Sequence, residues 1–151
     1  MSDDRGAIEG LLADYADLID DGDFDGVGAL FASGRVCDAT GSVIAEGADQ
    51  VRALYETTTR RYPEGTPRSH HLVSNLAITI DGNEAVARSR FTVFQAVDGG
   101  DLRPIISGRY ADTFTRTDSG WCFAERRMDP RLTGDLSAHL LIDLPDGDQP
   151  R

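Results

Sequence analysis

Three turn signals punctuate the second half of the chain, and they restrict what it can fold into more than any other feature. The signals are Asp81-Gly82, Asp98-Gly99-Gly100-Asp101 and Asp118-Ser119-Gly120, combinations that close β-hairpins. Between them, β-branched and aromatic residues alternate with polar ones, as in half-buried strands. The predicted strands are 68–80, 84–97, 103–117 and 121–128. Because strands joined by tight turns pair antiparallel, this half predicts a meander, which Pro130 is expected to end.

The first half has helical periodicity instead. Apolar residues recur at three- and four-residue spacing, which predicts helices at 7–20, 24–31 and 47–61. Two short strands, 35–39 and 43–45, are expected between the second and third helices, and a short closing helix at 132–141. Helices followed by a meander indicate the α+β class, with the helices on one face of a curved antiparallel sheet. Such a cone leaves an apolar pocket between helices and sheet.

Length and charge narrow the function classes. The 151 residues predict a single domain, 1–151, with a core of about 7–140 and flexible tails. The net charge of −11 argues against nucleic acid or an anionic membrane as a partner. We see no signal peptide and no apolar run long enough to span a membrane. Cys37 and Cys122 are expected to be free thiols, which fits a cytoplasmic protein. Neither metal-ligand spacing nor a nucleotide-binding loop is present, so no cofactor is expected.

Several sequence blocks, taken in order, resemble the SnoaL-like branch of the NTF2-like superfamily. They are the run 15–31, Gly47 with Val51-Arg-Ala-Leu-Tyr55, His71-Leu-Val-Ser-Asn75, the run 108–116, and Gly120-Trp121 with Arg126-Arg127. The resemblance covers roughly 7–140 and implies an NTF2-like cone. Its members include scytalone and bile-acid dehydratases, a lindane dehydrochlorinase, polyketide cyclases, ketosteroid isomerase and non-catalytic binding modules. It also implies a homodimer that pairs through the outer sheet face.

The histidines are the first candidates for chemistry. Histidine most readily carries a proton near neutral pH, and it acts best as a base when a carboxylate orients it. By residue type alone, His71 and Asp20 could equally be a core histidine and a solvated helix-end acid. The resemblance implies instead that they form a dyad, because dehydratase and dehydrochlorinase relatives pair such residues. Strict alternation would turn His70 inward, unless a bulge intervenes. His71 is chosen for its family-like spacing to Asn75, and His70 is kept as the second choice.

Other candidates follow from position or from the resemblance. Tyr15 lies on the apolar face of the first helix, where its hydroxyl could donate to a substrate oxygen or find any core partner. Asp38 lies near the general base of ketosteroid isomerases, but it could equally be a turn acid. Strand arginines such as Arg109 could hold an anion, although an outward position is favoured. Asn75 could orient a substrate, and Phe91 could form the pocket wall.

These residues predict a cofactor-free enzyme that acts on a small hydrophobic molecule of polyketide, steroid or terpenoid type. In the favoured reading, His71 and Asp20 carry out a dehydratase-like elimination with help from Tyr15. One alternative is an isomerase or cyclase that uses Asp38 and Tyr15. The other is a non-catalytic ligand-binding or subunit domain.

Overall fold

The computed structural model of the protein describes residues 3–143. Its helices are α1 (Asp4–Asp20), α2 (Phe24–Leu30) and α3 (Gly47–Thr58). Its strands are β1 (Arg35–Cys37), β2 (Val43–Glu46), β3 (Ser69–Asp81), β4 (Glu84–Gln95), β5 (Arg103–Thr117) and β6 (Gly120–Thr133). The sequence-based expectation of helices first and a meander later is confirmed. Within the described residues, no helix has the length and apolar character needed to cross a membrane.

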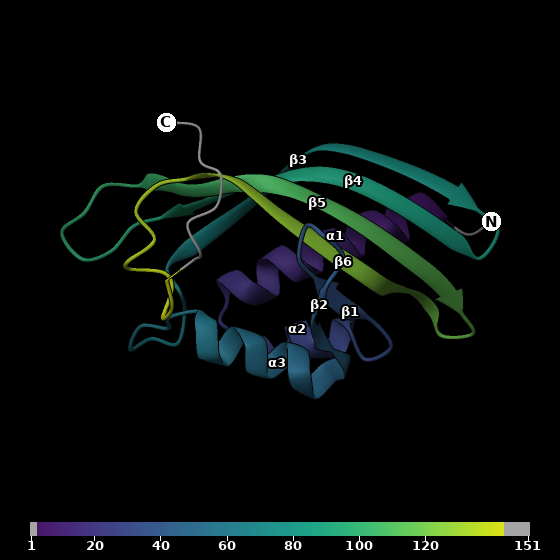
Figure 1. The fold of residues 1–151 in the computed structure, drawn as a ribbon, viewed down its shortest axis with the longest axis horizontal. Coiled ribbons are helices and arrows are strands. Elements are labelled where there is room, and N and C mark those ends of the chain that lie inside the picture. The colour runs from purple at the N-terminus through teal and green to yellow at the C-terminus, as the bar shows by residue number, and fades with distance from the viewer. Residues whose placement is uncertain (1–2, 144–151) are drawn as a thin grey trace.

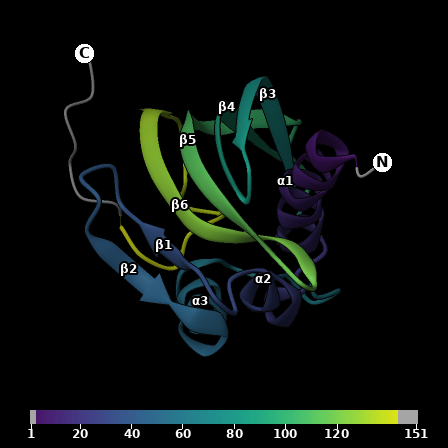
Figure 2. The same cartoon turned by 90° about the vertical axis from the view of Figure 1, so that its right-hand side faces the viewer.

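The strands form one curved sheet in the order β2-β1-β6-β5-β4-β3. Neighbouring strands run antiparallel, except that β1 is parallel to β6. The helices cover one face of this sheet, called the inner face below, while the outer face carries no helix (Figure 1). Seen from the side, the strands curl around the helices without closing into a barrel (Figure 2). This is the α+β cone predicted from the sequence.

The ends of α1 are set by local chemistry. The Asp3 side chain caps the helix by accepting a hydrogen bond from the Gly6 backbone N–H at 2.8 Å, so the helix begins before the predicted residue 7. Its other end is a turn at Gly22, where φ is +75° and an added Cβ would lie 1.9 Å from the Gly65 carbonyl oxygen. Only glycine fits there without strain. The turn therefore fixes where α1 ends, and Asp20 is its last residue.

The end of the sheet differs from the prediction. Pro130 does not stop β6, which continues to Thr133. It lies opposite Gly108, next to a shift in the β5–β6 register, and beyond Arg127 the other side of β6 has no paired strand. Proline is tolerated at bulges and on edges because no ladder hydrogen bond is lost there.

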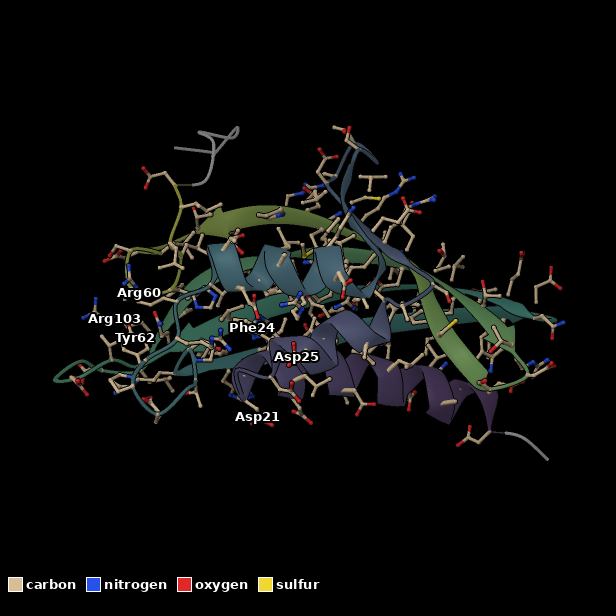
Figure 3. All side chains as sticks on the ribbon, turned by 90° about the horizontal axis from the view of Figure 1, so that it is seen from below. Asp21, Phe24, Asp25, Arg60, Tyr62 and Arg103 are labelled. Atoms are coloured by element: carbon tan, nitrogen blue, oxygen red, sulfur yellow. The ribbon has the colours of Figure 1, made fainter. Side chains whose placement is uncertain are left out.

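The expected closing helix at 132–141 is also absent from the described residues, and an irregular segment, 134–142, with a single turn at 137–139 takes its place. Hydrogen bonds to backbone atoms of this closing segment hold it against the end of α3 and the residues that follow α3. The Arg60 N–H donates to the His139 carbonyl at 2.8 Å, and the Leu141 N–H donates to the Thr58 carbonyl at 2.9 Å. The Tyr62 hydroxyl donates to the Ala138 carbonyl at 2.6 Å. Figure 3 shows Arg60 and Tyr62 together at this end of the molecule. The predicted tail beyond residue 143 lies outside the described residues.

A β-bulge changes which side chains of β3 face inward. The pairing with β4 shifts between Ser74 and Ala77, and Asn75 adopts φ 54°, a left-handed conformation that asparagine tolerates better than most residues. Before the bulge, His71 pairs with the buried Val93, and after it Ile78 pairs with the buried Ala87. Both sets of inward residues can therefore lie on one face, although they break strict alternation.

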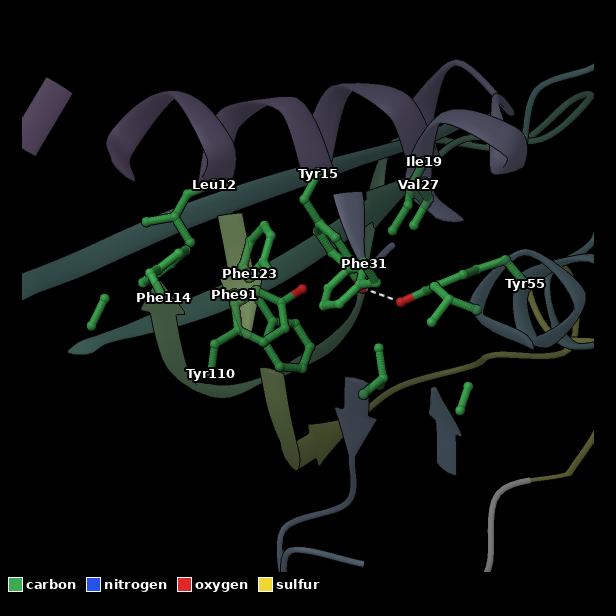
Figure 4. Packing of buried hydrophobic residues seen from close by; sticks show 14 of the residues in the cluster. Leu12, Tyr15, Ile19, Val27, Phe31, Tyr55, Phe91, Tyr110, Phe114 and Phe123 are labelled. Carbon is green, nitrogen blue, oxygen red and sulfur yellow. Dashed lines mark hydrogen bonds between the residues drawn. The ribbon is translucent and has the colours of Figure 1, made fainter. Parts of the chain in front are cut away.

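The space between helices and sheet is filled mainly by aromatic rings (Figure 4). Tyr15 descends from α1 and meets Phe31 and Tyr110 edge-on, with ring centroids 6.2 and 6.0 Å away. Phe91 stacks on Tyr110 at 4.4 Å. Packing of this kind stabilises the cone by burying large rings and by favourable ring geometry.

Candidate active site

Asp20 and His71 meet where the end of α1 packs on β3. The Nδ1 atom of His71 lies 2.6 Å from Oδ1 of Asp20, and the two side chains are only 8% and 17% exposed. The same carboxylate accepts the His71 backbone N–H at 2.8 Å and the Ser69 hydroxyl at 2.8 Å. Because β3 is an edge strand, its free backbone donors need such a partner. Three donors thus fix the position of this carboxylate.

The electrostatics favour an ionised Asp20. Burial works against its charge, but the hydrogen bond and charge of His71, the His71 backbone N–H and the Ser69 hydroxyl outweigh burial and lower the Asp20 pKa. A carboxylate can only accept hydrogen bonds, so it selects the His71 tautomer that carries its proton on Nδ1. The other ring nitrogen, Nε2, then has a free lone pair.

His139 lies close to this pair. Its ring centroid is 6.5 Å from that of His71, it is 6% exposed, and its Nδ1 atom has no hydrogen-bond partner among the described residues. Burial and the charge of His71 lower the pKa of His139 to about 4, with Asp20 opposing them. His139 is therefore a neutral imidazole at physiological pH.

Deeper in the cone, Tyr15 from α1 and Tyr55 from α3 join their hydroxyl groups in a hydrogen bond, drawn as a dashed line in Figure 4. The Tyr15 hydroxyl also lies 3.8 Å from the sulfur of Met128. Burial raises the pKa of both tyrosines above the ordinary value. Both hydroxyls therefore keep their protons and act as donors.

A buried ion pair lies beside the tyrosines. Arg126 binds Asp112 through two hydrogen bonds of 2.8 Å, and both side chains are completely buried. The guanidinium carbon lies 3.6 Å from the Tyr110 ring centroid and 4.2 Å from that of Tyr15. Its Nη1 atom has no hydrogen-bond partner in the described structure. The outward position favoured for strand arginines is thus wrong for Arg126, because Asp112 compensates its charge inside the cone.

The remaining predicted residues are not brought to the Asp20–His71 pair. His70 is exposed on the outer face, with its ring 6.1 Å from Phe94. Asn75 and Arg109 are also exposed, and both line a groove on the outer face. Phe91 is buried inside the cone.

Asp38 belongs to a turn and not to the cone interior. It accepts hydrogen bonds from the Thr40 hydroxyl at 2.7 Å and from the Thr40 and Ser42 backbone N–H groups at 2.9 and 3.0 Å. The Thr40 hydroxyl and, against the effect of desolvation, the backbone donors of the turn lower the pKa of Asp38. A carboxylate held in this way is a poor base, so the isomerase alternative loses geometric support.

Three residues of the site did not stand out in the sequence. Ser69 and Tyr55 look like ordinary strand and helix positions, because their roles depend on contacts between distant elements. His139 was given no role from the sequence. The one sequence feature that could have drawn attention to His139 is that the chain contains only 3 histidines.

Comparison with known proteins matches residues 1–127 to the family model described as the SnoaL-like domain. A search of curated proteins finds no match. Among solved structures, an NTF2-like protein with a cystatin-like fold from Novosphingobium aromaticivorans is 26% identical, with a TM-score of 0.71 over 89% of this chain and 86% of that one.

Two further solved structures resemble this chain. A protein from Novosphingobium aromaticivorans that is provisionally named a scytalone dehydratase is 26% identical, with a TM-score of 0.68 over 87% of this chain and 86% of that one. LinA has a TM-score of 0.67 over 95% of this chain and 94% of that one, but it is only 16% identical and so shows the fold alone.

Proposed function

The chain belongs to the family of SnoaL-like domains, and on that premise we propose that it is a cofactor-free enzyme whose general base is His71. The observation that carries the proposal is the 2.6 Å contact between His71 Nδ1 and Asp20 Oδ1 in a largely buried setting. This arrangement leaves Nε2 to accept a proton from a substrate and places a negative charge where the imidazolium forms. The family and its dehydratase-named neighbour support a small-molecule substrate.

The tyrosine pair supplies the complementary acid. When Tyr55 donates to Tyr15, the Tyr15 proton points to the Met128 sulfur, a weak acceptor at 3.8 Å that a substrate oxygen would replace. Tyr15 and Asp20 lie on the same helix, five residues and about 7.5 Å of helix rise apart. The acid and the carboxylate that orients the base are thereby held by one rigid element.

With these groups, the favoured reaction is a dehydratase-like elimination. His71 removes a proton from a substrate carbon, and the electron pair of that C–H bond forms a double bond as the neighbouring C–O bond breaks. The departing oxygen takes a proton from the tyrosine pair and leaves as water. The proton on His71 then returns to the tyrosinate through solvent, which restores both groups. We expect a small hydrophobic substrate of polyketide, steroid or terpenoid type, because the side chains packed in the interior are mainly apolar and aromatic, and binding would displace part of this packing.

The test compares neighbouring histidines. Purified wild type, His71→Ala and His70→Ala are incubated with a panel of hydroxylated polyketide-like, steroid and terpenoid compounds, and loss of water is followed by mass spectrometry. His71→Ala should lower turnover by about 10²–10⁴-fold. His70→Ala is the matched control, because its ring lies on the outer face, and it should keep wild-type turnover.

Tyr15→Phe should lower turnover less than His71→Ala, since Tyr55 retains a hydroxyl and the ring packing is kept. Equal activity of the two histidine variants would refute the base assignment. Ligand binding without turnover in any variant would favour the binding-domain alternative.

The homodimer, the cytoplasmic location and the single-domain organisation stay predictions. The outer face does expose Leu72 and Val86, which are 44% and 53% accessible. A partner molecule that covered them would remove apolar surface from water.

A further inference from the structure

The outer face of the sheet contains a groove of about 600 Å³ on the side away from the Asp20–His71 pair. Arginine side chains dominate its lining. We define the outer groove by Asn75, Arg88, Arg90, Arg109, Arg127 and Arg131, and one acid, Asp129, also lines it. Its volume lies within the roughly 300–1,000 Å³ range of small-molecule sites.

The concentration of positive charge is unusual for this chain. The net charge is −11, and all 15 basic residues are arginines. Five of these arginines line the outer groove. A random distribution of the 15 arginines would not place a third of them in the outer groove. Arginines that served only solubility would be expected to lie beside acidic residues.

Several of the groove arginines lack such acids. Arg127 pairs with Glu125 at 2.8 Å, and Arg131 pairs with Asp129 at 2.7 Å. Within residues 3–143, Arg88, Arg90 and Arg109 make no ion pair.

Strand register brings like charges together in the groove. Arg90 and Arg109 are direct cross-strand partners in the β4–β5 ladder, and Arg88 lies two residues before Arg90 on the same face of β4. Like charges at directly opposed positions destabilise a sheet. The sequence therefore maintains an arrangement that folding alone disfavours, which indicates a role for it.

We propose that the outer groove binds a small molecule carrying two or more phosphate or carboxylate groups. Guanidinium groups offer a planar fork of N–H donors that matches both kinds of anion. Bound anions would also relieve the repulsion between Arg90 and Arg109. Asn75, which lies in the bulge of β3, adds an amide at the border of the same groove.

Other occupants fit less well. A nucleic acid extends beyond a groove of this size, and its phosphates would meet the acidic remainder of the chain. A second copy that docked its own outer groove here would bring two arginine clusters together, so the homodimer predicted through the outer face must be offset from the groove and leave it open. The charge of a compact polyanion would be neutralised by the arginines of the outer groove, and such a molecule is too small to reach the acidic surface around it.

The experiment is isothermal titration calorimetry on the full chain, at low and at physiological ionic strength. The probes are pyrophosphate and citrate, which carry several anionic groups, and inorganic phosphate, which carries only one phosphate group and serves as the comparison. We expect saturable one-to-one binding of pyrophosphate, citrate or both, weaker binding of phosphate, and loss of affinity as salt rises. The preferred probe separates a phosphate ligand from a carboxylate ligand.

Two double variants decide whether the outer groove is the site. Arg90→Gln/Arg109→Gln should weaken binding by about tenfold or more, and its thermal midpoint should stay unchanged or rise because like charges are removed. Arg5→Gln/Arg103→Gln removes the same charge from exposed positions outside the groove, and Arg103 is seen in Figure 3 at the end near Arg60. This control should keep wild-type affinity.

The proposal is overturned if no probe binds saturably at low salt, or if both double variants weaken binding equally. It is also overturned if a single-stranded oligonucleotide binds more tightly than either multivalent probe. None of these outcomes depends on His71 or on turnover, so the proposed elimination chemistry stands or falls separately.

Discussion

Replacing Asp20 by asparagine tests the orientation of His71 with almost no change in shape. In the wild type, one carboxylate oxygen accepts the His71 Nδ1 proton and the Ser69 hydroxyl, and the other accepts the His71 backbone N–H. Asparagine can replace only one of these acceptors, because its amide nitrogen is a donor. If the nitrogen faced the backbone N–H, two donors would meet. The amide oxygen should therefore keep that N–H, which turns the amide nitrogen toward His71 Nδ1.

This rotation reverses the tautomer of His71. An amide N–H that points at Nδ1 requires a lone pair there, so the imidazole proton moves to Nε2 and the substrate-facing base is lost. The variant also loses the negative charge that stabilises an imidazolium. We expect kcat/KM to fall by about 10²–10⁴-fold, which corresponds to about 3–5 kcal/mol of transition-state stabilisation.

The assay need not wait for the substrate. Nitrogen NMR of the histidine rings distinguishes a protonated from an unprotonated Nδ1, and His71→Gln assigns the signal. The wild type should carry the proton on Nδ1, and Asp20→Asn should carry it on Nε2. Asp21→Asn makes the same change at the adjacent, exposed acid, seen in Figure 3, and should leave the tautomer unaltered. An unchanged His71 tautomer in Asp20→Asn would refute the reasoning.

Two further predictions concern stability. The pKa of His139 is lowered to about 4 by burial and a neighbouring histidine, whereas the unfolded chain protonates near its ordinary value of 6.5. The unfolded state therefore binds the extra proton between these values, and stability should fall as pH drops from 6.5 to about 4, by about 3 kcal/mol. His139→Gln should flatten this slope in urea melts, the exposed His70→Gln should not, and an unchanged slope would contradict the assignment. Asp112→Asn leaves the Arg126 charge buried and should cost about 3–5 kcal/mol of unfolding free energy. Asp129→Asn, at a more exposed pair, should cost less than about 1 kcal/mol, and similar losses in urea denaturation would count against the first estimate.

The sequence predicted the class and order of elements because periodicity and turn residues are local signals. The bounds of β5 agree with the prediction, and α2 begins at the predicted residue 24. Local signals failed where a distant partner decided the outcome. Pro130 looked like a stop signal, but the register shift opposite Gly108 accommodates it. The segment 134–142 looked helical, but its backbone is held by α3 and the residues that follow it.

The residues of the candidate site also fall into two groups, those that the sequence indicated and those that depend on distant contacts. The sequence resemblance singled out Asp20 and His71, and the fold brings them into contact. Tyr55 could not be foreseen, because its hydroxyl partner is forty positions away on another helix. Arg109 was expected to face outward, and its exposed side chain lines the outer groove. Composition could not reveal that five arginines would share one hollow, since they come from three different strands.

The bulge of β3 determines which residues before and after it face the same side of the sheet. Side chains of a strand alternate, so one added residue reverses the side of everything beyond it. In β3 the reversal lets His71 and Ile78, seven positions apart, face the same interior. Losing the bulge without losing a residue would restore simple alternation over these seven positions, and then either His71 would turn to solvent or the apolar half of β3 would leave the core. Exchange of β3 between relatives must therefore preserve the bulge together with the length of the strand, because an unbulged segment of the same length, aligned by its apolar half, would present His70 in place of His71.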